Sequence, residues 1–414
     1  MKNKLIKSMV GISLLSFGIL LTSCDDASHH QLATPAKTKY VSTVNMDKDD
    51  LDSFYSFNGR LANLLYKQDN NNFCISPVSI YMGLSMLEGV TNDTDCAQIE
   101  KFIGIDKDKN QKLCEDIYKN ISNTTGNTIT NTLWLSDSYT YKDNCINNLA
   151  NKYYAYPFSV DWKKNDSLNL VHDFINKNTN GFIDYTPKYD PDRILLLMNT
   201  LFIKDGWKRN GENLDFTKEK YDFINYDNTV KNNYLLDGAY QSGQVATNDV
   251  YKMFYTKTSE HLSIDFLVPN DGYTVDDLFK DNIFYDAIKT RYSYGTEDVT
   301  YYTKVQFPCF SANYEEDICP ALKNEGLTFL NEPTRLSKLI SDDKDVIIKD
   351  IKHVTKLDVN EKGITAAAVT QISANATSCE PKPEVYDTFL VNKAFAFIIK
   401  SESMPLFVGA IKNI

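Results

Sequence analysis

One segment near the C-terminus reads Asn360-Glu361-Lys362-Gly363-Ile364-Thr365-Ala366-Ala367-Ala368-Val369-Thr370-Gln371-Ile372-Ser373-Ala374-Asn375-Ala376-Thr377-Ser378-Cys379-Glu380-Pro381-Lys382-Pro383. Its side chains alternate in character, as they do in a strand with one buried face. One side is small or apolar and carries Ile364, Ala366, Ala368, Thr370, Ile372 and Ala374. The other side is mostly polar and carries Thr365, Gln371, Ser373 and Asn375. No charge occurs from Ile364 to Cys379, so nothing there opposes burial in a sheet. The prolines that follow are typical of an exposed loop.

The chain around this segment predicts one mixed α+β domain over residues 50–414. Apolar residues recur at helical spacing at Leu51, Phe54, Phe57, Leu61, Leu64 and Leu65. Apolar runs at 195–203, 261–268 and 394–399 predict buried strands. There is no internal repeat and no second change in composition.

Short motifs are spread over the whole of this domain. They are Phe73-Cys74-Ile75-Ser76-Pro77-Val78-Ser79-Ile80, Gly89-Val90-Thr91, Thr179-Asn180-Gly181, Asn199 with Trp207, Asn392-Lys393-Ala394-Phe395 and Pro405-Leu406-Phe407-Val408-Gly409. Together with Asn360-Glu361-Lys362-Gly363 and the alanine run after it, they resemble the serpins, a family of protease inhibitors. The resemblance implies a fold of three β-sheets and about eight or nine helices, with an exposed reactive loop at about 361–389.

The resemblance also assigns roles to individual residues. The hinge of the loop would consist of Glu361, Gly363, Ile364, Ala366, Ala367, Ala368, Val369 and Thr370. Structural positions under the main sheet, which serpins call the shutter and the breach, would be Ser76, Ser79, Asn199, Trp207 and His353. The chain departs from the family pattern at Ile364, usually Thr or Ser, and at Thr365, usually Glu. Ile364 is uncharged and belongs to the inward-facing side, so we expect insertion to survive.

The implied activity is suicide inhibition. A protease attacks the loop and forms an acyl-enzyme. The loop then inserts into the main sheet, and the bound protease is trapped. The usual loop length places the reactive bond at Thr377-Ser378, within the window Ala376 to Ser378. Small uncharged residues there favour elastase-like or subtilisin-like serine proteases, with papain-like cysteine proteases as a further target class. Alternatives are a non-inhibitory serpin and, in another class, a surface glycan-binding lipoprotein, although the 26 tyrosines are scattered along the chain.

Residues 1–23 resemble a lipoprotein signal peptide. Basic residues precede the apolar run Val10 to Leu21, and Leu21-Thr22-Ser23-Cys24 resembles a bacterial lipobox. The sequence therefore predicts a lipid on Cys24, a flexible tether over 24–49, and attachment to a bacterial envelope, at the outer membrane or the cell surface.

Composition excludes several other classes. The net charge of −11 disfavours nucleic acid as a partner. No HExxH, GxSxG or glycine-rich phosphate loop points to an enzyme. The eight cysteines show no zinc-type spacing, so we expect no metal and no cofactor. If Cys24 carries a lipid, an odd number of cysteines remains, and we therefore expect mostly free thiols. We also expect a monomer.

Overall fold

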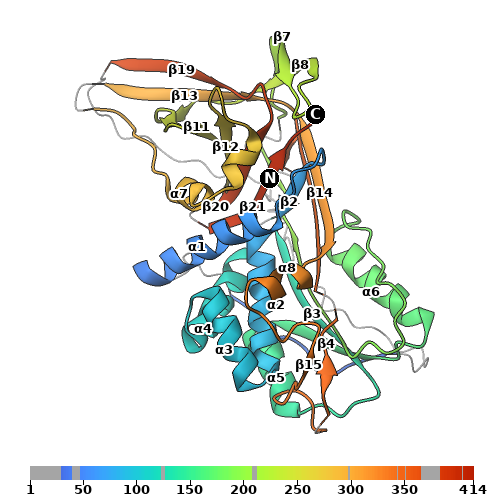
Figure 1. The fold of residues 1–414 in the computed structure, drawn as a ribbon. Coiled ribbons are helices and arrows are strands. Elements are labelled where there is room, and N and C mark those ends of the chain that lie inside the picture. Colours follow the sequence, from blue (N-terminus) through green and yellow to red (C-terminus); the bar gives the residue numbers. More distant parts are fainter. Residues whose placement is uncertain are drawn as a thin grey trace, which may run out of the picture.

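The computed structural model describes residues 29–39, 47–122, 126–207, 212–296, 299–342, 344–349, 351–364, 383–402 and 404–414. Eight α-helices lie in these ranges, together with several sheets, which confirms the predicted α+β class (Figure 1). The helices are α1 (Lys48–Leu65), α2 (Pro77–Val90), α3 (Asp93–Ile103), α4 (Lys107–Ser122), α5 (Asp143–Lys152), α6 (Asn165–Asn178), α7 (Ile283–Lys289) and α8 (Cys319–Asn324). No helix in the described ranges is long and apolar enough to span a membrane.

Local sequence signals explain where the first helices begin. The side chain of Asp47 caps α1 by accepting the backbone N–H of Asp50 at 2.9 Å. Ser76 caps α2 in the same way, and Pro77 occupies the first turn, where its missing N–H costs nothing. Of the periodic apolar residues of α1, four are buried, as the pattern predicted, and Leu51 and Leu64 are partly buried against the same core.

The main sheet consists of two groups of strands. One group has the order β1-β4-β3-β5, and the other has the order β14-β17-β18-β6. Strand β5 runs on into β6 after a break of two residues, so the groups belong to one sheet. The bounds are β1 (His29–Gln31), β3 (Thr128–Ser136), β4 (Ala155–Val160), β5 (Leu195–Phe202), β6 (Asp205–Gly206), β14 (Phe310–Asp317), β17 (Lys352–Asn360) and β18 (Gly363–Ile364).

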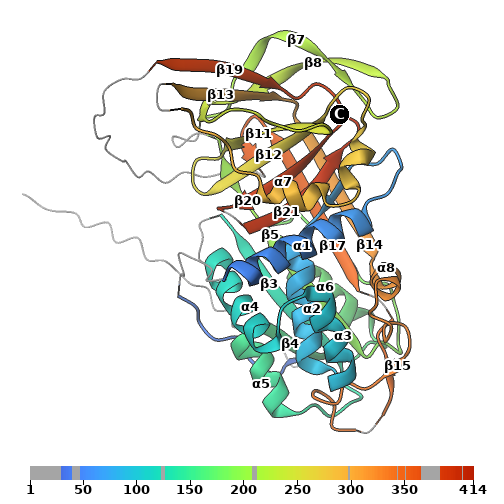
Figure 2. The same ribbon diagram turned by 60° about the vertical axis from the view of Figure 1, so that its left-hand side comes forward.

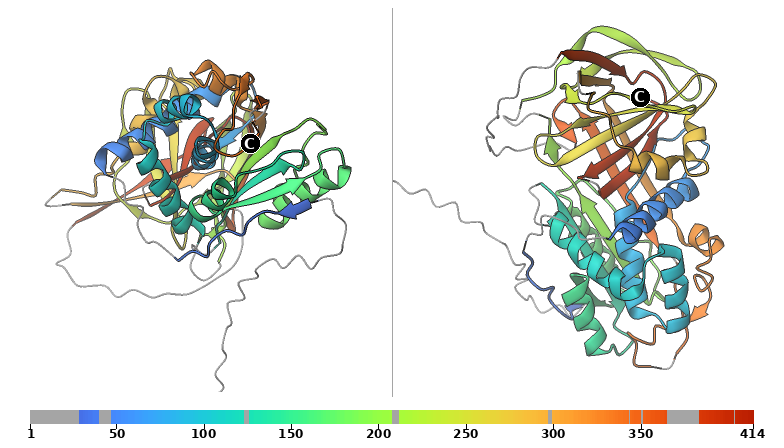
Figure 3. Two further views of the ribbon diagram at one scale, coloured as in Figure 1. Left: turned by 90° about the horizontal axis from the view of Figure 1, so that it is seen from below. Right: turned by 90° about the vertical axis from the view of Figure 1, so that its left-hand side faces the viewer.

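Alternating side chains bury both faces of the first group. Leu133 and Leu135 point to the main core, which is shared with helices α1 to α5. Trp134 points the other way, into a second cluster with Leu196 and with Val171 of α6. Figures 1 and 3 show α6 on the side of these strands opposite the α2 to α5 group, and in Figure 2 that group lies in front of α6. Both faces of this group of strands are therefore covered, which suits long apolar strands.

Two further sheets lie above the main sheet (Figure 3). The six-stranded sheet has the order β10-β11-β12-β20-β21-β2, and the five-stranded sheet runs β19-β13-β8-β7, with β9 also paired to β13. The predicted strands at 261–268 and 394–399 are confirmed as β12 and β20. The bounds are β2 (Phe73–Ile75), β7 (Phe216–Ile224), β8 (Val230–Asp237), β9 (Gln241–Ser242), β10 (Ala246–Thr247), β11 (Tyr251–Lys257), β12 (Leu262–Pro269), β13 (Thr300–Phe307), β19 (Glu384–Leu390), β20 (Phe395–Ser401) and β21 (Met404–Ile411). A small pair, β15 (Pro333–Thr334) and β16 (Val346–Ile347), stands apart.

The structure corrects the predicted tether in part. Within the segment 24–49, β1 pairs antiparallel with β4, and Leu32 packs against the main core. Helix α1 also begins at Lys48, before the predicted boundary. The edge strand β4 has backbone N–H and C=O groups that need hydrogen-bond partners. The polar segment that contains β1 supplies these partners, although it lacks apolar periodicity.

Candidate functional site at the opening of the main sheet

The main sheet is divided between β5 and β17. In the described residues these strands have no hydrogen-bond ladder with each other, and only β18 joins the two groups. Gly363 and Ile364 of β18 pair with Asn360 and Val359 on one side. On the other side they pair with β6, Gly363 with Gly206 and Ile364 with Asp205. Both pairings are antiparallel. A strand that continues from Ile364 between β17 and β5 would therefore be antiparallel to both of them.

Trp207 holds the turn that leads into β18. Its indole Nε1 donates to the carbonyl oxygen of Asn360 at 2.6 Å, and its ring lies against Phe307 with centroids 5.5 Å apart. The backbone N–H of Leu214 donates to the carbonyl of Glu361 at 2.7 Å. The predicted breach residue Trp207 thus lies at the start of the predicted hinge.

Gly363 is the position where only glycine fits. Its φ of +148° is unfavourable for residues with a side chain. A Cβ at this position would also lie 2.2 Å from the carbonyl oxygen of Asp205. The close approach of β18 to β6 therefore depends on the missing side chain.

Asp205 anchors the β6 side of the breach, and sequence reasoning did not identify it. Its buried carboxylate accepts from the hydroxyl of Thr258 at 2.5 Å, the hydroxyl of Ser259 at 3.1 Å and the backbone N–H of His261 at 3.2 Å. The ring of His261 contacts the amide nitrogen of Asn127 through Nε2 at 2.9 Å. Burial lowers the pKa of His261, although Asp205 opposes this shift. The ring is therefore neutral at pH 7, and hydrogen bonds hold Asp205 in place.

Below the breach, the structure brings Ser76, Ser79 and His353 together. The Nε2 atom of His353 accepts the backbone N–H of Ser76 at 3.0 Å. Burial lowers the pKa of His353 to about 3, so the ring is neutral and can accept this bond. Asn199 bonds elsewhere. Its amide nitrogen donates to Asn131, its register partner on β3, at 2.5 Å.

Two polar atoms of the predicted structural residues lack a hydrogen-bond partner among the described residues. They are the hydroxyl oxygen of Ser79 and the carbonyl oxygen of the Asn199 side chain, both buried. A buried unsatisfied group costs about 1–3 kcal/mol, and such groups store free energy that a rearrangement can release. The predicted hinge residues Ala366 to Thr370 and the reactive window Ala376 to Ser378 lie outside the described residues.

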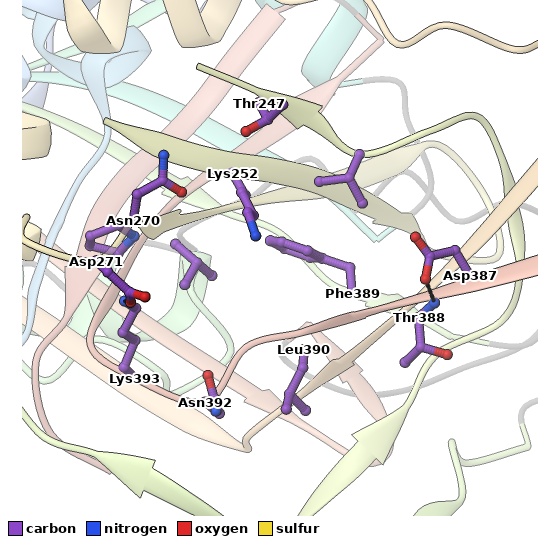
Figure 4. Close-up of a pocket in the computed structure, with 13 residues that line it drawn as sticks. Thr247, Lys252, Asn270, Asp271, Asp387, Thr388, Phe389, Leu390, Asn392 and Lys393 are labelled. Carbon is purple, nitrogen blue, oxygen red and sulfur yellow. Dashed lines mark hydrogen bonds and ion pairs between the residues drawn. The ribbon is translucent and has the colours of Figure 1, made fainter. Parts of the chain in front are cut away.

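One pocket lies away from this opening, where residues of β19 meet residues of β10, β11 and the end of β12. It measures about 740 Å³ and is shown in Figure 4. Its charges have mixed sign, and Lys393 pairs with Asp271 at 3.5 Å. No cluster in the described ranges has the side chains to hold a metal ion. The six described cysteines form no disulfide with one another, and five of them are buried.

Comparisons with known proteins agree with this geometry. A family model described as serpin (serine protease inhibitor) matches residues 53–414. The chain is 24% identical to an alpha-1-antitrypsin-like protein of Ictidomys tridecemlineatus, over 98% of this chain and 96% of that protein. It is 21% identical to neuroserpin of Homo sapiens, over 83% and 87% of the two chains.

Solved structures give the same fold. The native state of the thermophilic serpin tengpin has a TM-score of 0.75 at 20% identity, covering 92% of this chain and 98% of that one. Serpin48 of Tenebrio molitor has a TM-score of 0.73 at 19% identity, covering 89% and 99%. The match of the family model to most of its length places this chain in the serpin family, a family of protease inhibitors and not of enzymes.

Proposed function

We propose that this protein is an inhibitory serpin that traps its target by inserting the reactive loop into the main sheet. The observation that carries this proposal is the position of β18. Two residues of the predicted hinge, Gly363 and Ile364, already lie between β17 and β6. The next uncharged residues need only continue in the same direction between β17 and β5.

The steps follow from this arrangement. The hydroxyl or thiol of a protease attacks the carbonyl at the reactive bond, the leaving amine takes a proton, and an acyl-enzyme forms. Loop insertion then competes with the water that would release the protease. Insertion adds a strand with hydrogen bonds on both edges, which provides the driving force. Inhibition requires that insertion be faster than hydrolysis.

The residues before the reactive bond suggest the target class. Ala376 and Thr377 are small and uncharged, which suits the shallow apolar pocket of elastase-like and subtilisin-like serine proteases. Papain-like cysteine proteases form the same kind of acyl-enzyme and are a further candidate. Proteases that require Lys or Arg before the bond fit poorly.

Ala368→Arg tests the insertion step. The change places a cation on the inward side of the alternating segment, where burial costs several kcal/mol, but leaves the reactive bond intact. We expect the variant to be cleaved as an ordinary substrate while the protease stays active. The matched control is Gln371→Arg, which puts the same charge on the outward side and should still inhibit. The readout is a complex that survives SDS electrophoresis. A wild-type yield of that complex from Ala368→Arg would refute insertion at this hinge.

We also propose that the protein is a lipoprotein of a bacterial envelope, anchored through Cys24 at the outer membrane or cell surface. The support is the lipobox-like Leu21-Thr22-Ser23-Cys24 after an apolar run. Cys24→Ala should abolish incorporation of radioactive palmitate and release the protein from membranes, whereas Cys74→Ala should not. Labelling that persists in Cys24→Ala contradicts the anchor.

A further inference from the structure

Exposed aromatic and apolar side chains gather on the five-stranded sheet. Among the described residues, most of the large hydrophobic side chains that face solvent belong to its strands or to the turn after β8. They include Phe216, Val230, Tyr234, Tyr240, Val385 and Tyr386. Exposed apolar groups that cluster in this way mark interaction surfaces, whereas isolated ones do not.

Three tyrosines of this sheet and its turn contact one another, and we call them the tyrosine patch. Tyr302 and Tyr386 are register partners on β13 and β19, with rings stacked 5.3 Å apart. Tyr240 meets Tyr386 edge to face at 5.0 Å. The hydroxyl of Tyr386 donates to the carboxylate of Glu384 at 2.6 Å. These contacts hold the rings before any partner arrives, so binding would cost little side-chain entropy.

The patch lies next to the C-terminal end of the reactive loop. Glu384, the first residue of β19, is six residues beyond Ser378. Six extended residues span at most about 20 Å. A protease domain of about 220 residues has a radius of gyration of about 17 Å. A protease seated on the reactive bond is therefore large enough to reach the patch.

The charged side chains that contact the patch are a lysine that is already paired and a carboxylate. Lys304 lies 5.7 Å from the ring of Tyr240, but its ammonium also pairs with Asp237 at 2.7 Å. Glu384 is an exposed carboxylate on the same face of β19 as Tyr386, because the two are separated by one residue in a strand. Tyrosine faces and carboxylates both attract cations, and the net charge of −11 adds to this field.

We propose that the tyrosine patch is a second docking surface for the protease attacked through the loop, and that it contacts a protease face bearing arginine or lysine side chains. This inference rests on the proposed function, because the occupant is the target protease. Tyrosine is enriched among the residues that dominate protein interfaces. The patch would raise the rate of association and the lifetime of the encounter complex. The ratio of insertion to hydrolysis after acylation would stay unchanged.

The test uses Tyr386→Ala, Tyr240→Ala and the double variant, with the full domain and a protease that forms the SDS-stable complex. The matched control is Tyr189→Ala, because Tyr189 and Tyr386 are both 56% exposed but Tyr189 lies in the segment between α6 and β5. The second-order rate of inhibition should fall about tenfold in the double variant, as for loss of an interface hot spot. The stoichiometry of inhibition should be unchanged. Tyr189→Ala should match the wild type, and raised salt should reduce the advantage of wild type over the double variant.

Two results would overturn the inference. The first is a wild-type rate in the double variant, provided that the wild type inhibits the protease. The second is a rate loss of equal size in Tyr189→Ala. If the rate is unchanged and the patch is needed for binding to a polysaccharide such as dextran, the surface is a sugar site instead. Failure of the wild type to form a complex with any protease would instead reject the proposed function. Tyr386→Phe guards against misfolding, because it keeps the ring and should retain most of the rate.

Discussion

At the scale of single residues, His353 connects local chemistry to stability. Its neutral ring accepts a hydrogen bond from Ser76, and burial holds its pKa near 3, below the ordinary value of about 6.5. The unfolded chain therefore binds a proton between these two pH values while the folded protein does not. By linkage, the contribution of His353 is fully present above pH 6.5 and is lost as the pH falls toward 3.

His353→Gln tests this linkage. The contribution of His353 to the free energy of unfolding should fall by as much as about 1.4 kcal/mol per pH unit below pH 6.5. The variant should melt a few degrees lower at pH 8, because a disturbed bond to Ser76 costs about 1–3 kcal/mol. Between pH 6.5 and 5 its melting temperature should depend less on pH than that of the wild type.

Melting curves across this pH range provide the measurement. The control is His172→Gln, because His172 lies between Asp173 and Asp184, which raise its pKa instead of lowering it. Equal pH dependence in wild type and His353→Gln would show that the ring is not buried as a neutral group.

At the scale of elements, β18 is the decisive feature. It has two residues, yet it is the only strand in the described ranges that joins the two groups of the main sheet. Its position depends on Gly363, on the turn held by Trp207, and on the β6 edge that Asp205 anchors. The elements around the breach thus hold the hinge at the entrance to the opening before any protease cuts the loop.

Gly363→Ala should expel β18 from this position. The new methyl group would meet the carbonyl oxygen of Asp205, so the hinge must move or the strands must separate. We expect the melting temperature to fall by several degrees and hydrogen exchange at Ile364 to increase. Gly326→Ala is the control, because Gly326 also has a positive φ, +111°, but has open space around it. Equal losses in the two variants would mean that backbone strain, and not the contact with β6, decides the effect.

At the scale of the whole molecule, the divided sheet predicts a native state that is less stable than the cleaved one. A complete inserted strand would add about ten backbone hydrogen bonds, each worth about 1 kcal/mol. A gain of 1 kcal/mol raises the melting temperature of a larger domain by about 2–4 °C. Cleavage at the reactive loop should therefore raise the melting temperature by roughly 20 °C or more.

Calorimetry before and after limited proteolysis measures this effect. The wild type should gain stability on cleavage, whereas cleaved Ala368→Arg should gain little, because a buried cation opposes insertion. A cleaved wild-type protein that melts at its original temperature would identify a non-inhibitory serpin, the alternative within the family.

The sequence by itself was enough to predict the family, the α+β class, helix α1 and strands β5, β12 and β20. These signals are local, because periodic apolar residues and caps act within one element, and family motifs are short. His353, Ser76 and Ser79 were also identified in this way, and the structure brings them together. The roles assigned to the loop residues from 365 to 382 stay predictions.

Only the tertiary structure decided how distant segments meet. The carboxylate of Asp205 accepts hydrogen bonds from residues more than fifty positions away, between β11 and β12. No local sequence pattern predicts these contacts. Strand β1 pairs with β4 because that edge has free backbone groups, although its own sequence is polar and without periodicity. Tyr240, Tyr302 and Tyr386 look scattered along the chain. Strand register makes Tyr302 and Tyr386 neighbours, and the turn after β8 brings Tyr240 to Tyr386. The physical reason is that hydrogen-bond register and packing act through space, whereas sequence patterns report only what each element does with its own residues.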